Sequence, residues 1–540
     1  MNKKALVYVE DTENLLEFAQ FLEKDGWTIY TNGKTADFLK KNGIPYKIDI
    51  SLDPVPKSIS ESASVVQKIL TTKIEGTSDQ PFISSDPDNS YFIVCANINP
   101  YDVRFSTVSK NDISGNSISP LLSAIIRVAV TNYKNVLLLT DPDDYKETII
   151  QIRTSDVRDD FRLYLAGKGL NLVSAYDATN SSEILKNNPY NTSPYNKYLT
   201  LPYEKMFDLH YGSNEHQSGA VYQLSPNFGA LSGLKKLQGK ELTHKIISDS
   251  CFAWEQIGML YDNLKTQYAV KSENCDGYPF TTQFTPLTGT VFTVIVKYTL
   301  VVGAGIDTNI IDSFNKTISY DPDTLDHATM GCSAVIDEEA ATEILKYNFS
   351  SLVAPGFTEE ARQILSENRS LRLIMATRPA HNKRTGSIVD GGLLIQESDK
   401  KLFEKWLVPT KTRPNQKLVD ELAFGMTVAM SAHSYASVAI KDNAVVGISS
   451  GVGSRKKSLE NVTYETKQTF KLHPTDDNKI IDVLVFDSAI ELSGPIQELI
   501  ERGLEAILQT GGHPNDKAFI DYCDAHGVSM IFTGMTHHTY

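Results

Sequence analysis

The sequence predicts a multidomain α/β protein whose N-terminal part is built on a parallel β-sheet with helices on both faces. Its 540 residues correspond to three or four domains at ~100–200 residues each. With 41% hydrophobic and 22% charged residues, the chain can form a large core of ordinary globular composition. Short apolar runs alternate with segments of helical spacing, and this alternation is typical of parallel strands joined by helices. Ligands of such sheets bind at the carboxyl ends of the strands, so functional residues are expected there.

The N-terminal elements follow one another as strand–helix pairs. In residues 14–24, Leu15, Phe18 and Leu22 recur at helical spacing and predict the first helix. Gly43 is a natural end for the second helix, because glycine readily adopts the left-handed conformation that closes a helix. Four short apolar runs predict buried strands, at residues 5–9, 27–30, 91–96 and 135–140.

The rest of the chain divides by composition. Residues 159–172 have helical spacing, whereas the Asn-, Ser- and Pro-rich residues 180–198 predict a connector. A second α/β region begins at about Phe207. We expect it to divide near residues 397–413, where a charged, proline-containing segment separates two sets of strands and helices.

The net charge of −14 argues against a polyanion as the partner, so we expect no nucleic acid and no membrane. A small anionic ligand is still compatible, because a pocket needs only local positive charge. The apolar run after Lys3 and Lys4 is short and ends at Glu10, which predicts a first strand and not a signal peptide. The sequence contains no run of ~18 apolar residues, the length that a membrane-spanning helix needs, so it predicts no membrane span. We therefore expect a cytoplasmic protein.

The cysteines indicate reduced, buried thiols and no metal site. They are scattered, odd in number and form no CxxC pair, as in cytosolic proteins. Neither four ligands at zinc spacing nor an HxE…PCxxC pattern is found. The five are Cys95, Cys251, Cys275, Cys332 and Cys523.

Three motifs have both a chemical and a structural interpretation. The turn of Asn32, Gly33, Lys34 and Thr35 can hold a phosphate on its backbone N–H groups, or it is a helix cap with a solvated lysine. Residues 447–451 match the GxSxG nucleophile pattern. No clear helix follows and no Asp…His order is evident, so a Gly/Ser turn is favoured, although residues 451–455 could bind an anion.

The third motif is Lys297 and Tyr298, at the end of an apolar run. A lysine in this position is costly to bury unless it is paired or used, but it can also reach solvent at the strand end.

Segments along nearly the whole chain, taken in order, resemble one family. Its members are bifunctional enzymes that formylate aminoimidazole carboxamide (AICAR) ribonucleotide with 10-formyltetrahydrofolate and then close the ring to inosine monophosphate. Residues 211–217 resemble its RYGENPHQ motif, 237–242 its LQGKELS motif and 527–535 its HGIAMVFTGM ending. Further similar segments are residues 5–11, 31–35, 42–45, 141–145, 161–163, 175–178, 353–361 and 510–512.

The resemblance implies an architecture. Residues 1–145 would form a methylglyoxal-synthase-like cyclohydrolase domain with a parallel sheet, and residues 146–205 a helical connector. Residues 206–395 and 396–540 would form a two-domain, cytidine-deaminase-like formyltransferase module. The family also implies a homodimer that builds the transferase site across its interface, with a ribonucleotide and the cosubstrate 10-formyltetrahydrofolate as ligands and no metal.

The resemblance also implies site residues. Lys297 and Tyr298 take the positions of the family's catalytic lysine and histidine, in its KHANPCG motif. The residues expected to bind substrate are Tyr211, Asn214, His216, Lys240, Arg455 and His537.

The cyclohydrolase half departs from the family at several positions. No GRVKTLHP segment occurs between residues 50 and 89, and Glu10 adds negative charge beside the expected phosphate. The tyrosine of NLYPF falls on Asn99 and the lysine of RAAAKN on Thr131. The aspartate of IDIGG falls on Ser119, or on Asp112 with a gap. Ring closure needs preorganised donors, so we expect this half to be inactive.

The transferase half is altered less. Two family arginines that would grip a phosphate are replaced by His210 and Thr536, and the catalytic histidine by Tyr298. Two hypotheses follow: a diverged formyltransferase, or a non-catalytic paralogue that acts as a nucleotide-binding or assembly subunit.

Overall fold

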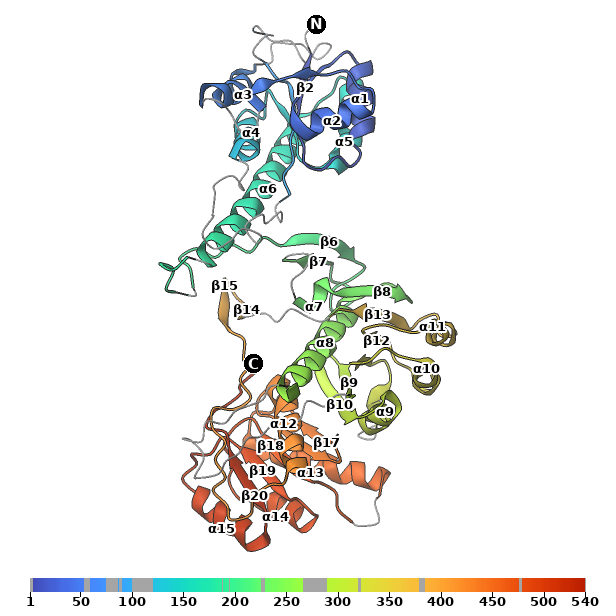
Figure 1. The fold of residues 1–540 in the computed structure, drawn as a ribbon, viewed down its shortest axis with the longest axis vertical. Helices are drawn as coiled ribbons and strands as arrows, with labels where there is room; N and C mark the ends of the chain where they lie inside the picture. Colours follow the sequence, from blue (N-terminus) through green and yellow to red (C-terminus); the bar gives the residue numbers. More distant parts are fainter. Residues whose placement is uncertain are drawn as a thin grey trace. The chain divides into compact units, whose positions relative to one another are not determined.

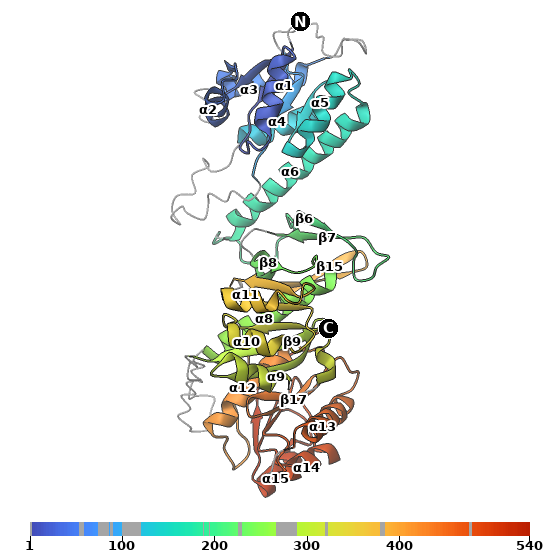
Figure 2. The same cartoon turned by 90° about the vertical axis from the view of Figure 1, so that its right-hand side faces the viewer.

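The computed structural model describes residues 3–52, 59–73, 86, 90–99, 120–186, 188–193, 195–224, 229–265, 289–318, 322–377, 384–474 and 478–539. The chain forms two compact units, Met1–Glu204 and Lys205–Tyr540, which are described separately (Figures 1 and 2). Among the helices of the described residues, none combines the length and the apolarity that crossing a bilayer requires.

The first unit is built on a five-stranded sheet in the order β3-β2-β1-β4-β5, with every neighbouring pair parallel. This confirms the parallel sheet that the alternating pattern predicts. The strands are β1 (Lys4–Val7), β2 (Thr28–Thr31), β3 (Lys47–Ile48), β4 (Ile93–Cys95) and β5 (Leu137–Leu139).

Helices cover both faces of this sheet, as predicted. Ala5 and Val7 pack on one face with Phe18 and Tyr145, while Leu6 points to the other face, as the alternation of side chains along a strand requires. The helices of this unit are α1 (Leu15–Lys24), α2 (Gly33–Lys41), α3 (Ile59–Thr71), α4 (Pro120–Thr131), α5 (Tyr145–Arg153) and α6 (Asp159–Lys186).

Helix α6 runs further than the sequence predicts, because residues 180–186 continue it into the expected connector. Asn and Ser are typical of loops, but here they bond back to the helix. The Asn180 amide donates to the Tyr176 carbonyl at 2.8 Å, and the Ser181 hydroxyl to the Ala178 carbonyl at 3.1 Å. These bonds satisfy the side chains without interrupting the helix.

The second unit contains an eleven-stranded sheet in the order β20-β19-β18-β16-β17-β10-β9-β11-β12-β13-β8. The antiparallel contact of Gly305 in β10 with Ala444 in β17 joins its two halves, so the sheet is continuous across the expected boundary at residue 396. The division into domains stays a prediction. The strands are β8 (Leu234–Gln238), β9 (Val291–Lys297), β10 (Leu300–Asp307), β11 (Thr329–Cys332), β12 (Ser351–Ala354), β13 (Arg372–Ala376), β16 (Ser437–Lys441), β17 (Ala444–Ser449), β18 (Val483–Phe486), β19 (Ala506–Gln509) and β20 (Ser529–Phe532).

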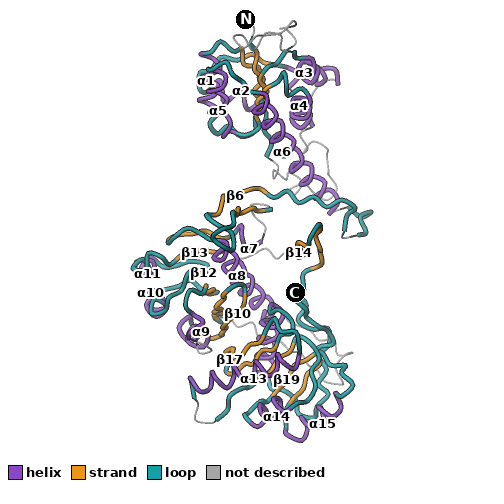
Figure 3. Tube along the Cα trace, turned by 180° about the vertical axis from the view of Figure 1, so that it is seen from behind, coloured by secondary structure: helices purple, strands orange, loops and turns teal. Residues whose placement is uncertain are grey.

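Two further ribbons stand outside this sheet. They are β6 (Glu204–Leu209) with β7 (Gly219–Gln223), and β14 (Arg384–Val389) with β15 (Gly392–Glu397), which pair only with each other (Figure 3). The helices of the unit are α7 (Gly229–Ser232), α8 (His244–Lys265), α9 (Ile310–Ile318), α10 (Glu338–Ile344), α11 (Glu359–Leu365), α12 (Gln416–Ser431), α13 (Arg455–Leu472), α14 (Gly494–Glu501) and α15 (Asp516–His526).

The GxSxG segment is not a nucleophile elbow. Ser449, at the position of the nucleophile, is a buried residue of the antiparallel strand β17. A helix does follow, contrary to the expectation from sequence: α13 begins at Arg455. Its buried face includes Thr463, Thr466 and Thr469, so it lacks the apolar periodicity that marks an amphipathic helix.

Helix α13 packs unusually close to β17, and a glycine makes this contact feasible. A Cβ atom on Gly447 would lie 2.4 Å from the Thr466 hydroxyl and 2.9 Å from the Val462 carbonyl oxygen. Gly494, at the start of α14, has no atom within 4 Å of the corresponding position.

We expect Gly447→Ala to lower the free energy of unfolding by about 1–3 kcal/mol, because α13 must shift away from the sheet. Gly494→Ala is the matched control and should change it by less than about 0.5 kcal/mol. Urea unfolding of the full chain measures both, and equal stability of the two variants would contradict this packing.

Candidate functional site

One edge of the eleven-stranded sheet collects most of the predicted site residues. β8, β9, β17, β18, β19 and β20 all run in the same direction, which follows from the antiparallel pairs of β9 with β10 and β11, β10 with β17, β16 with β17 and β18, and β8 with β13. Their carboxyl ends therefore lie at one edge. Lys297 ends β9, while Lys240, Arg455 and His537 follow β8, β17 and β20.

These residues are spread along the edge. Neighbouring strands lie ~4.8 Å apart, so Lys297 on β9 and the loop after β17, two strands away, are separated by about 10 Å. β8, which precedes Lys240, is four strands from β9, or about 19 Å. Of these positions, Lys297 and the loop before Arg455 are near enough to contact one small ligand within a single chain.

Lys297 and Tyr298 lie at a tight turn that a buried carboxylate holds in place. Tyr298 and Thr299 have φ angles of 56° and 58°, in the left-handed region that side chains other than glycine seldom adopt. The Asp249 carboxylate accepts hydrogen bonds from the N–H groups of Tyr298 at 3.3 Å and Thr299 at 2.7 Å. Asp249 comes from α8, is fully buried and pairs with Lys245 at 2.8 Å. Its fixed position offsets the strain of the turn.

The two side chains of the turn differ in exposure. The half-buried Lys297 ammonium donates to the Thr324 carbonyl at 3.3 Å, so it is held at the end of β9. The Tyr298 side chain is 68% exposed, and the Lys245 ammonium lies 5.0 Å from the centre of its ring. Lys297 is thus fixed by the fold, whereas the phenol of Tyr298 faces solvent.

A second group of side chains forms a cationic and aromatic corner around Arg455. The Arg455 guanidinium lies 5.0 Å from the centre of the Tyr435 ring, and this ring meets His538 edge-on at 5.9 Å. The loop is fixed by backbone bonds from Tyr435 N–H to the Val452 carbonyl at 3.1 Å and from Gly451 N–H to His433 O at 2.7 Å. Arg455 is the first residue of the 18-residue helix α13, whose N-terminus favours an anion.

Sequence reasoning missed two members of this corner, Tyr435 and His538. Its choice at the C-terminal end of the chain, His537, lies at the same edge, but its ring is buried. The nitrogens of this ring face two acceptors, the Asp399 carboxylate at 2.6 Å and the Leu402 carbonyl at 3.2 Å. His538 is exposed and lies 3.1 Å from the Ser434 hydroxyl. No periodicity distinguishes two adjacent histidines, so only the packing separates them.

The remaining substrate-binding candidates lie near the far end of the edge. Asn214 donates from its backbone and its side chain to the Gln217 amide oxygen, both at 3.0 Å, so it shapes its own loop. Ser213 links this loop to His244, at the start of α8, across 3.4 Å. His216 and Lys240 are exposed.

Arg372, which sequence reasoning also missed, lies in the same region. Burial lowers the pKa of its guanidinium, and the nearby Tyr211 partly opposes this shift. Its Nε donates to the Glu241 carbonyl at 2.9 Å. His210 and Thr536, which stand in place of the two family arginines, are both exposed.

In the first unit, the predicted phosphate turn lies between β2 and α2, as expected. Asn32 caps α2 by accepting from Gly33 N–H at 2.8 Å, and Gly33 has a φ of 54°. The Thr35 hydroxyl is buried and bonds to both the N–H and the carbonyl of Val9, at 3.1 and 3.0 Å. Lys34 is exposed. The cap therefore already uses two of the four groups, and phosphate binding stays a prediction.

Acidic side chains surround this turn. The Glu10 carboxylate accepts from Asn99 N–H at 3.0 Å, and the Asn97 amide oxygen holds the N–H groups of Glu10 and Asp11. The buried Asp49 accepts from the Asn32 amide through its backbone carbonyl at 3.4 Å, and its carboxylate pairs with Lys68 at 3.2 Å. Such a site repels a phosphate unless the anion finds stronger donors.

The charge of Asp49 is kept by its partners. Burial alone would raise the pKa of this carboxyl, but hydrogen bonds from Ser51 and Tyr91 and the charge of Lys68 outweigh it, so the pKa lies below its usual value. Asp49 is therefore ionised at neutral pH.

At the other family positions, Thr131 bonds back to the Arg127 carbonyl at 3.0 Å, while Asp112 and Ser119 lie outside the described residues.

Known proteins resemble this chain over almost its whole length. The sequence profile of the AICARFT/IMPCHase bienzyme matches residues 129–464. The bifunctional purine biosynthesis protein PurH of Clostridium acetobutylicum is 30% identical to this chain, and the match covers 99% of both proteins. PurH of Petrotoga mobilis is 27% identical over 99% of both. The crystal structure of ForH covers 34% of this chain and 98% of its own, at 22% identity and a TM-score of 0.28, which is too low to bear on the fold.

The two adjacent histidines allow a direct test of the site geometry. We expect His537→Ala to lower the free energy of unfolding by about 2–4 kcal/mol, because it leaves Asp399 and the Leu402 carbonyl without their donor. His538→Ala should change it by less than about 0.5 kcal/mol. Denaturant unfolding compares the two variants, and a larger loss for His538→Ala would contradict the assignment.

Proposed function

This chain belongs to the family of AICARFT/IMPCHase bienzymes, and we propose that it transfers a formyl group from 10-formyltetrahydrofolate to AICAR ribonucleotide at the carboxyl edge of the eleven-stranded sheet. The family is one of bifunctional purine biosynthesis proteins. The observation that carries the proposal is the position of Lys297. It ends a buried strand at the same edge of the sheet as the corner of Tyr435, Arg455 and His538, which lies two strands away.

The chemistry requires a proton acceptor and a donor for the carbonyl oxygen. The substrate amine is a poor nucleophile because the ring and its carboxamide withdraw the lone pair, so its proton must leave as the formyl carbon is attacked. The formyl oxygen becomes negative at the same time and needs a donor. The Lys297 ammonium can supply this donor. Tyr298 stands where the family has its general-base histidine, and a phenol accepts a proton far less readily near neutral pH than an imidazole does. The amine proton would therefore leave to solvent water beside the exposed Tyr298 side chain.

The corner at Arg455 provides a binding surface for the nucleotide. Tyr435 and His538 offer ring faces for a heterocycle, and Arg455 and the N-terminus of α13 offer positive charge for an anionic group. Two arginine contacts of the family are absent, at His210 and Thr536. Each charge-assisted hydrogen bond contributes ~1.5–3 kcal/mol, so binding of AICAR ribonucleotide should be weaker by about 100-fold or more than in a protein that has both.

We also propose that the transferase acts as a homodimer. β8, which precedes Lys240, lies four strands from β9, or about 19 Å along the edge, so Lys240 and Lys297 do not form a compact site within one chain, and residues from a second copy would complete it. The β14–β15 ribbon supports this arrangement. An isolated two-stranded ribbon is only marginally stable in water, yet Ile388 is 89% and Leu394 63% exposed. A second copy of the chain would cover these side chains.

The first unit, in this proposal, no longer catalyses ring closure. Asn99 and Thr131 stand where the family has a tyrosine and a lysine, and Thr131 bonds back to its own helix. Glu10, Asp11 and Asp49 place negative charge around the phosphate turn. A stabilising role for this unit, without its own turnover, is consistent with its intact core.

The alternative function is a non-catalytic nucleotide-binding or assembly subunit. The lost arginines favour it, and so does the tight turn at Tyr298, which turns the phenol toward solvent. It would keep the binding corner at Arg455 but show no transfer.

The first prediction for this proposal concerns formyl transfer. With AICAR ribonucleotide and 10-formyltetrahydrofolate, the wild-type rate of tetrahydrofolate release should be low, because Tyr298 stands where the family has its general-base histidine. Tyr298→His should raise the rate near pH 7 by up to ~10²–10⁴-fold, the contribution of a positioned general base. Lys297→Ala should abolish it. If wild type and both folded variants are inert at every pH, the non-catalytic function is the correct one.

The second prediction concerns the first unit. The full chain supplied with formyl-AICAR ribonucleotide should produce no inosine monophosphate above background, because donors are missing at Asn99 and Thr131. Any affinity of this unit for inorganic phosphate should depend on Lys34, and Lys34→Ala should weaken it by ~1.5–3 kcal/mol at most. Absorbance of the product measures the first effect and calorimetry the second. Measurable ring closure would show that other groups supply the protons.

A further inference from the structure

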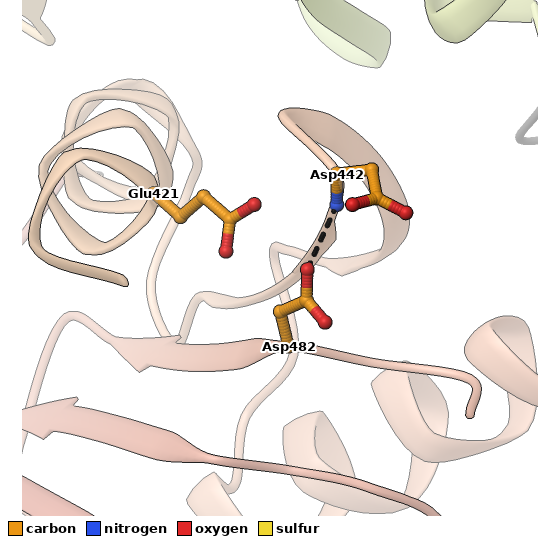
Figure 4. A group of neighbouring side chains, drawn as sticks. All are labelled: Glu421, Asp442 and Asp482. Carbon is orange, nitrogen blue, oxygen red and sulfur yellow. Dashed lines mark hydrogen bonds between the residues drawn. The ribbon is translucent and has the colours of Figure 1, made fainter. Parts of the chain in front are cut away.

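Three carboxylates meet at the opposite edge of the eleven-stranded sheet, away from Lys297 and Arg455. Glu421 lies on α12, Asp442 in the turn between β16 and β17, and Asp482 directly before β18. One oxygen from each lies within 4.8 Å of the other two (Figure 4). The three segments are far apart in sequence, so the fold alone brings them together.

The backbone holds this cluster in place. Asp442 and Asn443 form the turn with φ angles of 48° and 60°. Their N–H groups donate to the other two carboxylates: Asp442 N–H to Asp482 Oδ2 at 3.0 Å and Asn443 N–H to Glu421 Oε1 at 3.1 Å. The positions of the oxygens are therefore set before any ligand arrives.

The cluster carries an excess of negative charge. The Lys417 ammonium lies 2.8 Å from Asp442, 3.0 Å from Asp482 and 3.7 Å from Glu421. Lys479 pairs with Asp482 at 2.5 Å and also with Glu505. Four carboxylates thus face two ammonium groups, which leaves two negative charges if all are ionised. Once Lys417 leaves, the four carboxylates face Lys479 alone, and a divalent cation would offset two of the three remaining negative charges.

One oxygen of the cluster has no partner. The Glu421 side chain is fully buried, and its Oε2 has no hydrogen-bond partner among the described residues. Figure 4 shows both Glu421 oxygens directed toward the space shared with Asp442 and Asp482. Burial raises the pKa of this carboxyl to about 8, with the negative charge of Asp482 as the second cause. A cation in that space would offset both causes and give the oxygen a partner.

We propose that Glu421, Asp442 and Asp482 form a binding site for a hard divalent cation of the calcium, magnesium or manganese class. Cation–oxygen distances of ~2.0–2.6 Å allow two ligands of one ion to be up to about 5 Å apart, and the three oxygens meet this limit. Such ions prefer oxygen ligands, and carboxylate oxygens are among them. Water would complete the coordination.

The Lys417 ammonium occupies this position in the structure and would leave when the ion binds. Its side chain is 50% exposed, so it can turn into solvent without disturbing the core. Because the site ties α12 to the β16–β17 turn and to β18, occupancy would stabilise the second unit. The site is independent of formyl transfer, since the residues of the proposed active site lie at the other edge.

The test is binding of Mn²⁺ to the full chain, followed by electron paramagnetic resonance, with Ca²⁺ as competitor. Wild type should bind one Mn²⁺ at this site at about 1 mM, a concentration that fills even weak carboxylate sites. Lys417→Met removes the competing ammonium and should raise the affinity by about 10-fold or more. Asp442→Asn should weaken it by at least ~10-fold while keeping the fold, because asparagine tolerates the left-handed turn. Glu421→Gln should abolish binding.

Glu460→Gln, on the exposed face of α13, is the matched control and should leave Mn²⁺ binding unchanged. Ca²⁺ should also raise the unfolding temperature of wild type and of Glu460→Gln, but not that of Glu421→Gln. The proposal is overturned if neither wild type nor Lys417→Met binds Mn²⁺, or if Asp442→Asn, folded by circular dichroism, binds it as wild type does.

Discussion

Between β10 and β17, the sheet of the second unit passes from one set of strands to the other through the antiparallel contact of Gly305 and Ala444. This junction aligns β9 with β17 and so brings the end of Lys297's strand and the loop before Arg455 to one edge. Glycines allow helices to pack closely against the two strands of this junction. A Cβ on Gly305 would lie 2.7 Å from the Ser313 carbonyl oxygen in α9. A Cβ on Gly447 would likewise lie 2.9 Å from the Val462 carbonyl oxygen in α13. Helices can therefore lie close against both strands without distorting the pairing.

The same strand directions separate the charges of the unit. The carboxyl edge carries Lys240, Lys297 and Arg455, while the opposite edge carries the carboxylates of Glu421, Asp442 and Asp482. In the two proposals, an anionic ligand binds at one edge and a cation at the other, although the chain as a whole carries a net charge of −14. The net charge of the chain does not describe the local field at either edge.

Much of the fold could be predicted from the sequence, because its signals are local. The apolar runs of the first unit and the glycine that ends α2 depend on a few adjacent residues. The errors arose where side chains replaced the usual signals: threonines on the buried face of α13, and amides and hydroxyls bonded back within α6. The residues of the candidate site could be predicted only from the family motifs that contain them, and not from any local pattern. Which of His537 and His538 faces solvent depends on Asp399, more than a hundred residues away, and no pattern near the histidines contains that information.

The junction of β10 with β17 also constrains how the chain is made. Residues 305 and 444 are separated by about 140 residues, whereas β9 and β10 pair through a turn of two. At ~5–20 residues per second, a ribosome completes β17 roughly 7–28 s after Gly305 has been added. During that interval the strands from β9 to β13 can already associate, and the side of β10 that will pair with β17 has no neighbouring strand. An unpaired strand of this kind is a template on which other chains can pair, so the second unit is open to aggregation until β17 has been made.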